Sequence, residues 1–202
     1  MFLRKVFRPV KYVVRKIVNS ILFSLFRINF LIYKRLYGFA FASNIISKLP
    51  SSDDFNVKLM RLEKAMIGTN CCIETPIHFY NCDDLSNFSV GDNCYIGKDC
   101  YFDLKDKINV CNNVTIAMKV TFITHMDAAN SNISNIYKKH SAAIHMGDNT
   151  YIGAGSIILM GTVIEGSVIG AGSIVPRDFI SKNEVVAGNP AKIMKSLAGR
   201  II

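Results

Sequence analysis

The 202-residue sequence has no tryptophan, only five prolines and no low-complexity segment. Half of its residues are hydrophobic, an ordinary share for a folded protein. Since biased, strongly polar composition is what keeps a chain disordered, its absence argues against disorder as the dominant state. The length allows one domain with a full core, or one domain with an appendage.

Acidic residues are missing from residues 1–52, while this segment contains ten bases: Arg4, Lys5, Arg8, Lys11, Arg15, Lys16, Arg27, Lys34, Arg35 and Lys48. Residues 53–202 contain the other fourteen bases and all fifteen acids, so their net charge is −1. The body therefore lacks the concentrated positive charge that phosphate contacts need, and we expect no nucleic-acid partner.

The N-terminal segment also lacks a long uninterrupted apolar run. Arg27, Asn19, Ser20 and other polar side chains divide the seventeen residues between Lys16 and Lys34, whereas a spanning helix needs roughly 20 apolar residues. Bases and aliphatic residues recur at helical spacing on opposing sides. We therefore expect helices lying on the anionic cytoplasmic face of a membrane; the alternative is a helical cap on the body or on a neighbouring subunit.

The boundaries of this segment follow from local signals. An Ala-x-Ala pattern at residues 40–42 resembles a signal-peptidase site, but Lys34 and Arg35 stand where a secretory signal is uncharged. The run SSDDF at residues 51–55 supplies Ser and Asp helix caps before a short segment ending near Met66. We divide the chain into a helical segment (1–52), a connector or short helix (53–66), a repeat region (67–180) and a C-terminal tail (181–202).

From Ile67 onward, an aliphatic or aromatic residue recurs every six positions and is followed by small, turn-forming residues, as in Val90-GDNCY, Ile96-GKDCY and Phe102. This period predicts short strands with a bend after each, because Gly, Asn and Asp tolerate the positive φ angles of bends. Three hexads would close one turn, and stacked turns would pair as parallel strands around a shared core.

The fifth position of the hexads is restricted to small side chains, which accounts for Cys71, Cys94 and Cys100 as packing residues. No CxxC or Cys/His ligand spacing is present among the six cysteines. We therefore interpret all six as reduced packing residues of a cytosolic protein, with a disulfide between neighbouring turns as the alternative.

The C-terminal stretch MGDNTYIGAGSIILMGTVIEGSVIGAGSIVPRDFISKNEVVAGNPAKIMKSL (146–197) resembles the signature of the hexapeptide-repeat acyltransferases, which include galactoside, maltose, serine and cell-surface polysaccharide O-acetyltransferases. The resemblance covers about residues 67–197. It implies a mainly β fold, a left-handed parallel β-helix with an N-terminal helical extension. It also implies a homotrimer that binds acetyl-CoA in grooves between subunits, with no metal.

The repeat is interrupted between Phe122 and Met146, so we expect a loop extruded over about residues 124–145. Long irregular loops within compact repeats are usually functional. His125 follows "FIT" where similar enzymes place a catalytic histidine, and it is our candidate general base for a weakly nucleophilic sugar hydroxyl. Asp127, two residues later, is a candidate for orienting the imidazole or binding the substrate.

Further site residues follow from the resemblance alone. It implies that the Ala154 amide forms an oxyanion hole and that the pantetheine arm passes Ala171. Pro176 and Arg177 stand where relatives often have Thr-Lys, and Lys192 and Lys195 match positions that approach the CoA phosphates. Asp99 aligns with a polar acceptor-binding position; the alternative is a turn residue.

Three features leave alternatives open. His140 and His145, together with His125, allow a three-histidine metal site like that of γ-class carbonic anhydrases to be drawn, but the spacing is short for that family. His78 is interpreted as a surface or interface residue. The spacing from Ile158 to Ile169 is eleven positions rather than twelve, so one residue is missing either before Val163 or after Ile164.

The resemblance therefore implies an acetyl-CoA-dependent O-acetyltransferase, which is the function that we expect for this chain. Its expected acceptor is a sugar of a cell-surface polysaccharide or of a lipid-linked precursor, modified at the inner face of the cytoplasmic membrane. The alternatives are N-acetylation of an amino sugar and a non-catalytic β-helical scaffold in membrane-associated glycan assembly.

Overall fold

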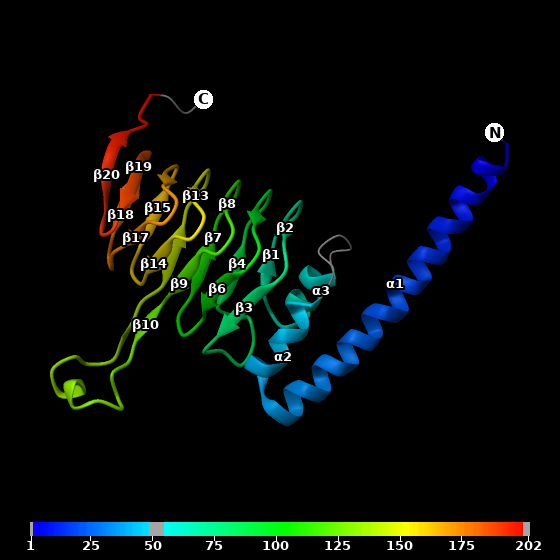
Figure 1. Ribbon diagram of the computed structural model, residues 1–202, viewed down its shortest axis with the longest axis horizontal. Coiled ribbons are helices and arrows are strands. Elements are labelled where there is room, and N and C mark those ends of the chain that lie inside the picture. The colour runs from blue at the N-terminus through cyan, green and yellow to red at the C-terminus, as the bar shows by residue number, and fades with distance from the viewer. Residues whose placement is uncertain (1, 49–54, 200–202) are drawn as a thin grey trace.

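The computed structural model describes residues 2–48 and 55–199, with side chains from residue 17 onward. A long helix α1 (Phe2–Tyr37) is followed by two short ones, α2 (Phe39–Ile46) and α3 (Phe55–Leu62). The rest of the described chain is a coil of short strands (Figure 1). The N-terminal end of α1 projects away from the coil, and α2 and α3 lie against its first turn.

The strands stack into three parallel sheets, one for each side of the coil. Sheet A contains β1 (Met66–Ile67), β4 (Phe88–Val90), β7 (Ile108–Val110), β12 (Ile144–Met146), β15 (Val163–Glu165) and β18 (Ile180–Lys182). Sheet B contains β2 (Cys72–Ile73), β5 (Tyr95–Ile96), β8 (Thr115–Ile116), β13 (Tyr151–Ile152), β16 (Val168–Ile169) and β19 (Glu184–Gly188), with β20 (Ala191–Ser196) antiparallel at its end. Sheet C contains β3 (Ile77–Tyr80), β6 (Cys100–Asp103), β9 (Thr121–Ile123), β14 (Ile157–Leu159) and β17 (Ile174–Val175).

The core is built from the first residue of each hexad, as the six-residue period predicts. Ile96, Ile116, Ile152 and Ile169 are fully buried and come from successive turns of sheet B. On sheet C the rings of Phe102 and Phe122 stack with centroids 4.9 Å apart. Since one turn alone cannot bury these faces, stacking creates the core. The predicted fold, a left-handed parallel β-helix with an N-terminal helical extension, is confirmed.

The bends between sheets A and B confirm the predicted use of small polar residues. Asn70, Asn93, Asn113 and Asn149 occupy this corner in four successive turns with φ between 53° and 58°, a left-handed conformation that asparagine tolerates. At the fifth hexad position, the small side chains are buried in seven of the eight cases, from Cys94 to Ser173, and Cys71 is half-buried. Within residues 2–48 and 55–199, no disulfide joins any of the six cysteines.

Two of the expected boundaries are refined. Ile164 lies six residues after Ile158 and pairs with Met146, so the missing residue falls after Ile164, in the bend at Gly166 (φ 58°).

The coil also continues past residue 180, because β18 and β19 pair in parallel with β15 and β16. A tail beginning at residue 181 is therefore wrong: residues 181–188 belong to a sixth turn.

Side chains from the helices bind the open edge of the first turn. The Asn56 amide donates to the Ile73 carbonyl, and the Ser47 hydroxyl donates to the Ile77 carbonyl. The Arg61 guanidinium donates to the Ile67 carbonyl at 2.9 Å. Each sheet thus has one edge carbonyl satisfied by a helical side chain, which avoids the cost of an unpaired backbone group.

Candidate active site

The interruption of the repeat forms a projecting loop between β9 and β12, as expected. Its stem is a two-stranded antiparallel ribbon of β10 (His125–Met126) and β11 (His140–Ser141), in which His125 is opposite Ser141. A single 3-10 turn, η2 (Asn132–Asn135), lies near its tip. The backbone N–H of Ala142 donates to the Thr124 carbonyl at 3.0 Å, closing the loop at its base. The ribbon begins where the loop leaves the coil (Figure 1), and His125 is the first residue of its first strand.

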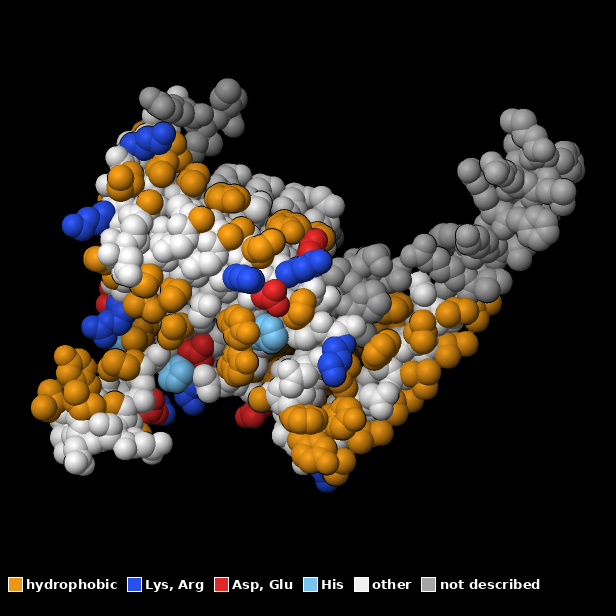
Figure 2. Space-filling model, in the orientation of Figure 1, with side chains coloured by type: hydrophobic (Ala, Val, Ile, Leu, Met, Phe, Trp, Pro, Cys, Tyr) orange, Lys and Arg blue, Asp and Glu red, His pale blue; other side chains and the backbone are white. Residues whose placement is uncertain are grey.

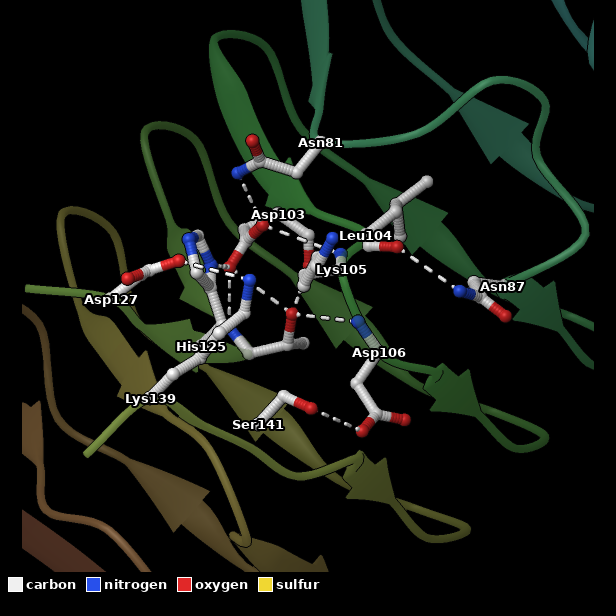
Figure 3. Close-up of polar contacts among 11 residues, drawn as sticks. Asn81, Asn87, Asp103, Leu104, Lys105, Asp106, His125, Asp127, Lys139 and Ser141 are labelled. Atoms are coloured by element: carbon white, nitrogen blue, oxygen red, sulfur yellow. Dashed lines mark hydrogen bonds and ion pairs between the residues drawn. The ribbon is translucent and has the colours of Figure 1, made fainter. Parts of the chain in front are cut away.

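His125 forms a hydrogen bond with an aspartate from the preceding turn. Its Nδ1 lies 2.6 Å from Oδ2 of Asp103, the last residue of β6 (Figure 3). Because a carboxylate can only accept, Nδ1 carries the proton, and Nε2 of the neutral ring is left as an acceptor. The His125 side chain is 24% exposed, whereas that of Asp103 is 11% exposed. The imidazole is therefore reachable from solvent while the group orienting it is largely enclosed.

Asp103 is fixed by donors on several sides. Asn81 Nδ2 donates to Oδ1 at 2.8 Å, and the Thr124 backbone N–H donates to Oδ2 at 2.9 Å. The Thr124 hydroxyl lies 2.8 Å from the Asp103 carbonyl, to which it donates. Burial acts to raise the pKa of Asp103, but hydrogen bonds from His125, Asn81 and Thr124 outweigh it and hold that pKa below its usual value. The carboxylate is thus ionised when it accepts from the imidazole.

Asp127 does not orient His125, contrary to our expectation. Its Oδ2 lies 2.9 Å from Lys139 Nζ, and its Oδ1 accepts from the Ala129 backbone N–H at 2.9 Å. The Lys139 hydrogen bond, followed by that of Ala129, lowers the pKa of Asp127. The contacts of Asp127 therefore stabilise the start of the loop. The orienting residue, Asp103, was missed because it is 22 positions away in sequence and is adjacent only when turns stack.

A hollow of about 320 Å³ is lined in part by Asn81, the residue whose amide binds the Asp103 carboxylate. The loop between β3 and β4 forms one wall with Asn81, Asp83 and Asn87, and Lys105 lines the other. Asn87 Nδ2 donates to the Leu104 carbonyl at 3.1 Å, tying the walls together. The lining presents amide, carboxylate and ammonium groups, which are the partners that a polyhydroxylated molecule would use. No signal in the hexad pattern indicated this hollow, because its lining residues lie in the connections that follow β3 and β6, outside the hexads.

The structure separates His125 from the expected oxyanion-hole residue within one chain. Ala154 precedes β14, whose far end, Leu159, pairs with Ile123 of β9. Ala154 lies in the bend before β14 (Ile157–Leu159), whereas His125 lies beyond the other end of sheet C, at which Leu159 and Ile123 pair. In the described part of the chain, no acceptor is within hydrogen-bond reach of the Ala154 N–H. The amide is thus available, but at the opposite corner of sheet C from His125.

Close stacking of turns surrounds Ala154 and Ala171. A Cβ added to Gly153 would lie 2.4 Å from the Ala171 nitrogen, so only glycine fits there. Gly155 and Gly172, by contrast, have open space beside them and φ angles of 69° and 68°. Residues 153–155 and 170–172 are both Gly-Ala-Gly, so no side chain at this corner is larger than a methyl group. An extended, uncharged arm such as pantetheine could therefore lie close to the backbone there.

The remaining cofactor candidates lie at the C-terminal end of the coil. Lys192 and Lys195 are exposed on β20, opposite Ala187 and Val185 of β19. Arg177 is exposed, whereas Pro176 is half-buried and its carbonyl accepts from the Thr162 hydroxyl. This end of the coil thus has three exposed cationic side chains. Such side chains bind phosphates, so they fit the phosphate groups that CoA carries.

The other candidates have structural surroundings. Asp99 lies in a bend with φ 58°, at the end of β6 remote from Asp103, as in the turn interpretation. His78 stacks on Tyr101, with ring centroids 4.4 Å apart. His140 is exposed on β11, and His145 Nε2 lies 3.7 Å from the Cys111 sulfur. Within residues 2–48 and 55–199, no three His, Cys, Asp or Glu side chains form a metal-binding group.

Comparisons with known proteins agree with this fold. The family model of the hexapeptide repeat of succinyl-transferase matches residues 88–121 and 144–177, on either side of the loop. Galactoside O-acetyltransferase of Escherichia coli K12 is 30% identical over 174 residues, which cover 83% of this chain and 81% of that protein. A putative acetyltransferase of Saccharomyces cerevisiae is 33% identical over 151 residues, covering 73% and 74% of the two chains.

Solved structures agree as well. A galactoside acetyltransferase in complex with coenzyme A superimposes with a TM-score of 0.68 at 28% identity and covers 78% of each chain. A maltose O-acetyltransferase from Clostridium difficile 630 gives a TM-score of 0.64 at 27% identity, covering 86% of this chain and 88% of that one. The chain therefore belongs to the hexapeptide-repeat acetyltransferase family. It is an acetyl-CoA-dependent acyltransferase.

Proposed function

We propose that the protein transfers an acetyl group from acetyl-CoA directly to a sugar hydroxyl, with His125 as general base. The observation that carries this proposal is the His125–Asp103 pair, which leaves Nε2 as an acceptor on a partly exposed ring; Asn81, which also binds Asp103, lines a polar hollow. Similarity to galactoside and maltose O-acetyltransferases supports a sugar acceptor. The basic, apolar N-terminal segment favours a cell-surface polysaccharide or its lipid-linked precursor as the natural acceptor.

The reaction balances without a covalent enzyme intermediate. His125 Nε2 accepts the hydroxyl proton as the sugar oxygen bonds to the thioester carbonyl carbon. Asp103 stabilises the imidazolium that forms, because its carboxylate accepts from Nδ1–H. When the carbon–sulfur bond breaks, the imidazolium returns the proton to the departing sulfur, so His125 ends the cycle neutral.

We further propose that the active site lies between two copies of the chain in a homotrimer. His125 and the unpaired Ala154 N–H stand at opposite corners of sheet C, so one chain cannot place both at the same carbonyl. An oxyanion donor must lie about 3 Å from the developing charge. A neighbouring copy would bring its own Ala154 corner to His125.

Acetyl transfer is tested with purified protein, acetyl-CoA and a panel of mono- and oligosaccharides. Mass spectrometry of the acceptor detects one added acetyl group, and base lability distinguishes an O-ester from an N-amide. Transfer to sugar hydroxyls is expected. Transfer confined to amino groups would favour N-acetylation, and transfer to no sugar would contradict the proposal.

The shared site is tested by mixing two inactive variants, His125→Ala and Ala154→Trp. In a mixed trimer, an intact His125 from the second chain faces an intact Ala154 corner of the first, so activity is expected to return on co-expression. Each variant expressed alone is the control. A mixture as inactive as its components would show that both groups act within one chain.

A further inference from the structure

The C-terminal half of α1 has one face packed on the body. Phe30 is fully buried, and its ring lies 6.0 Å from that of Phe39 in α2. Phe23, about two turns earlier in the direction of the N-terminus, has its ring 5.5 Å from that of Phe55 in α3. Lys34 forms an ion pair with Glu63, which follows α3. These contacts fix the rotation of the helix about its own axis, and they determine which side faces outward.

The opposite side of α1 is an exposed aliphatic surface, which we name the outer stripe. Its residues are Ile17, Val18, Ile21, Leu25, Ile28 and Ile32, each between 47% and 57% exposed. At 100° per residue they fall within an arc of about 100°. Figure 2 shows hydrophobic side chains continuing along the outer edge of this helix. Soluble proteins rarely leave so continuous an apolar surface in water.

The charge of the same segment indicates what covers the outer stripe. Residues 1–52 contain ten Lys or Arg and no Asp or Glu, and six of these bases precede Ile17 on the same helix. A second protein surface would need both an apolar groove and a strong excess of acidic residues. An anionic lipid surface supplies both properties at once, because its headgroups attract bases and its acyl boundary accepts aliphatic side chains.

We propose that α1 binds the surface of an anionic lipid bilayer through the outer stripe and its N-terminal bases, holding the enzyme at the membrane. The proposal rests on α1 alone and is independent of the acetyl acceptor.

The contacts of α1 favour lying on the bilayer over crossing it. Residues Ile17–Tyr37 are long and apolar enough to span by composition. However, spanning would surround the helix with lipid, which requires Phe23 and Phe30 to leave the body and the Lys34–Glu63 pair to break. It would also place Arg27 within the hydrocarbon. Lying flat keeps every one of these contacts and buries only the outer stripe.

The test is co-sedimentation of the full chain with two kinds of vesicle, one of phosphatidylcholine and one of phosphatidylcholine with phosphatidylglycerol. Binding to the anionic vesicles is expected, with release in about 1 M salt, where screening is nearly complete. Equal binding to both vesicles, or retention of all protein in high salt, would overturn the proposed surface mode. Absence of binding to either would overturn the proposal as a whole.

Variants locate the contact. Replacing Ile21, Leu25 and Ile28 together with Asn is expected to lower the affinity for anionic vesicles at least tenfold. Arg4→Gln with Arg8→Gln is expected to lower it by about fivefold per base, the equivalent of about 1 kcal/mol each. A matched control, Met66→Asn with Ile180→Asn, replaces residues that are at least 66% exposed on the β-helix and should leave vesicle binding unchanged.

Light scattering coupled to size-exclusion chromatography tests whether the outer stripe contacts lipid or another protein subunit. The outer-stripe variant is expected to keep the oligomeric state of the unmodified protein, since these side chains contact lipid rather than another subunit. Dissociation of the oligomer by this variant, together with unchanged vesicle binding, would show that the outer stripe is a subunit contact and would overturn the proposal.

Discussion

Nδ1 of His125 lies 2.6 Å from Oδ2 of Asp103, although 22 positions separate the two residues in sequence. The register of sheet C produces this contact. Phe102 pairs with Phe122, so the ends of β6 and β9 lie side by side, and Asp103, the last residue of β6, lies next to the chain that leaves β9. Asp103 therefore reaches the first residues of the extruded loop, and the position of His125 depends on how two turns are stacked.

Replacing His125 with Ala is expected to reduce kcat by roughly 10²–10⁴-fold, the usual contribution of a general base. The KM for acetyl-CoA should change little, because His125 acts on the acceptor hydroxyl. His140→Ala is a matched control, since His140 lies in the same ribbon but is exposed and has no contact with Asp103. Equal losses in the two variants would indicate damage to the loop rather than loss of a base.

Replacing Asp103 with Asn is expected to reduce kcat by more than tenfold with the fold intact. An amide can donate to Nδ1, which would shift the proton to Nε2 and remove the acceptor that takes the hydroxyl proton. Asp127→Asn, which breaks only the Lys139 contact, should cost much less. If steady-state kinetics give Asp127→Asn the larger effect, the orienting role belongs to Asp127.

The lowered pKa of Asp103 also makes the free energy of unfolding depend on pH. Its folded-state pKa lies below the unfolded value, which is about 3.9. Its contribution is therefore present above that pH and is lost as pH falls through the lower, folded-state pKa. Urea unfolding between about pH 5 and pH 3 should show a shallower loss of stability in Asp103→Asn than in the unmodified protein. An identical slope in the two proteins would contradict this linkage.

The cysteines are expected to differ in alkylation. Burial, followed by the charges of Asp83, Asp84 and Asp103, raises the pKa of Cys82 to about 12, and burial raises that of Cys100 to about 11. Since the thiolate is the reactive form, both should resist iodoacetamide at pH 8 while the exposed Cys72 is modified. Peptide mass spectrometry over time gives the order, and early labelling of Cys82 would contradict it.

Gly153 and Gly155 should respond oppositely to a side chain. Gly153→Ala places a Cβ 2.4 Å from the Ala171 nitrogen, and such overpacking typically costs about 1–3 kcal/mol. Gly155 has φ 69° and open space beside it, so Gly155→Asn, a residue that tolerates this conformation, should cost less than about 1 kcal/mol. Urea unfolding measures both. Equal destabilisation would show that the turns are not packed as closely as described.

The period of six was enough to predict the coil, its inward-facing residues and the loop that carries His125. The reason is that each of these depends on residues close in sequence. Asp103 and Asn81 could not be predicted, because they reach His125 only through the lateral stacking of sheet C. Asp127 was mistaken for the orienting residue since nearness in sequence favoured it.

The separation of Ala154 from His125 could not be predicted from the sequence either. Both positions came from a resemblance in sequence, and sequence order gives no distance between corners. The end of the coil was misplaced at residue 180 for a different reason. The last turn has Ser181 rather than an aliphatic residue at its inward position, where Ser181 is buried and donates to Glu184 Oε2 at 2.9 Å.

Three carbonyls of the first turn, one on each sheet, accept hydrogen bonds from the side chains of Ser47, Asn56 and Arg61. A stack of parallel strands has no intrinsic last member, since every exposed edge can template another chain. The helices before β1 therefore limit the length of the assembly as well as covering its core. A fragment that begins at Met66 would expose three unpaired edges together, and we expect it to form end-to-end fibres where the whole chain stays discrete.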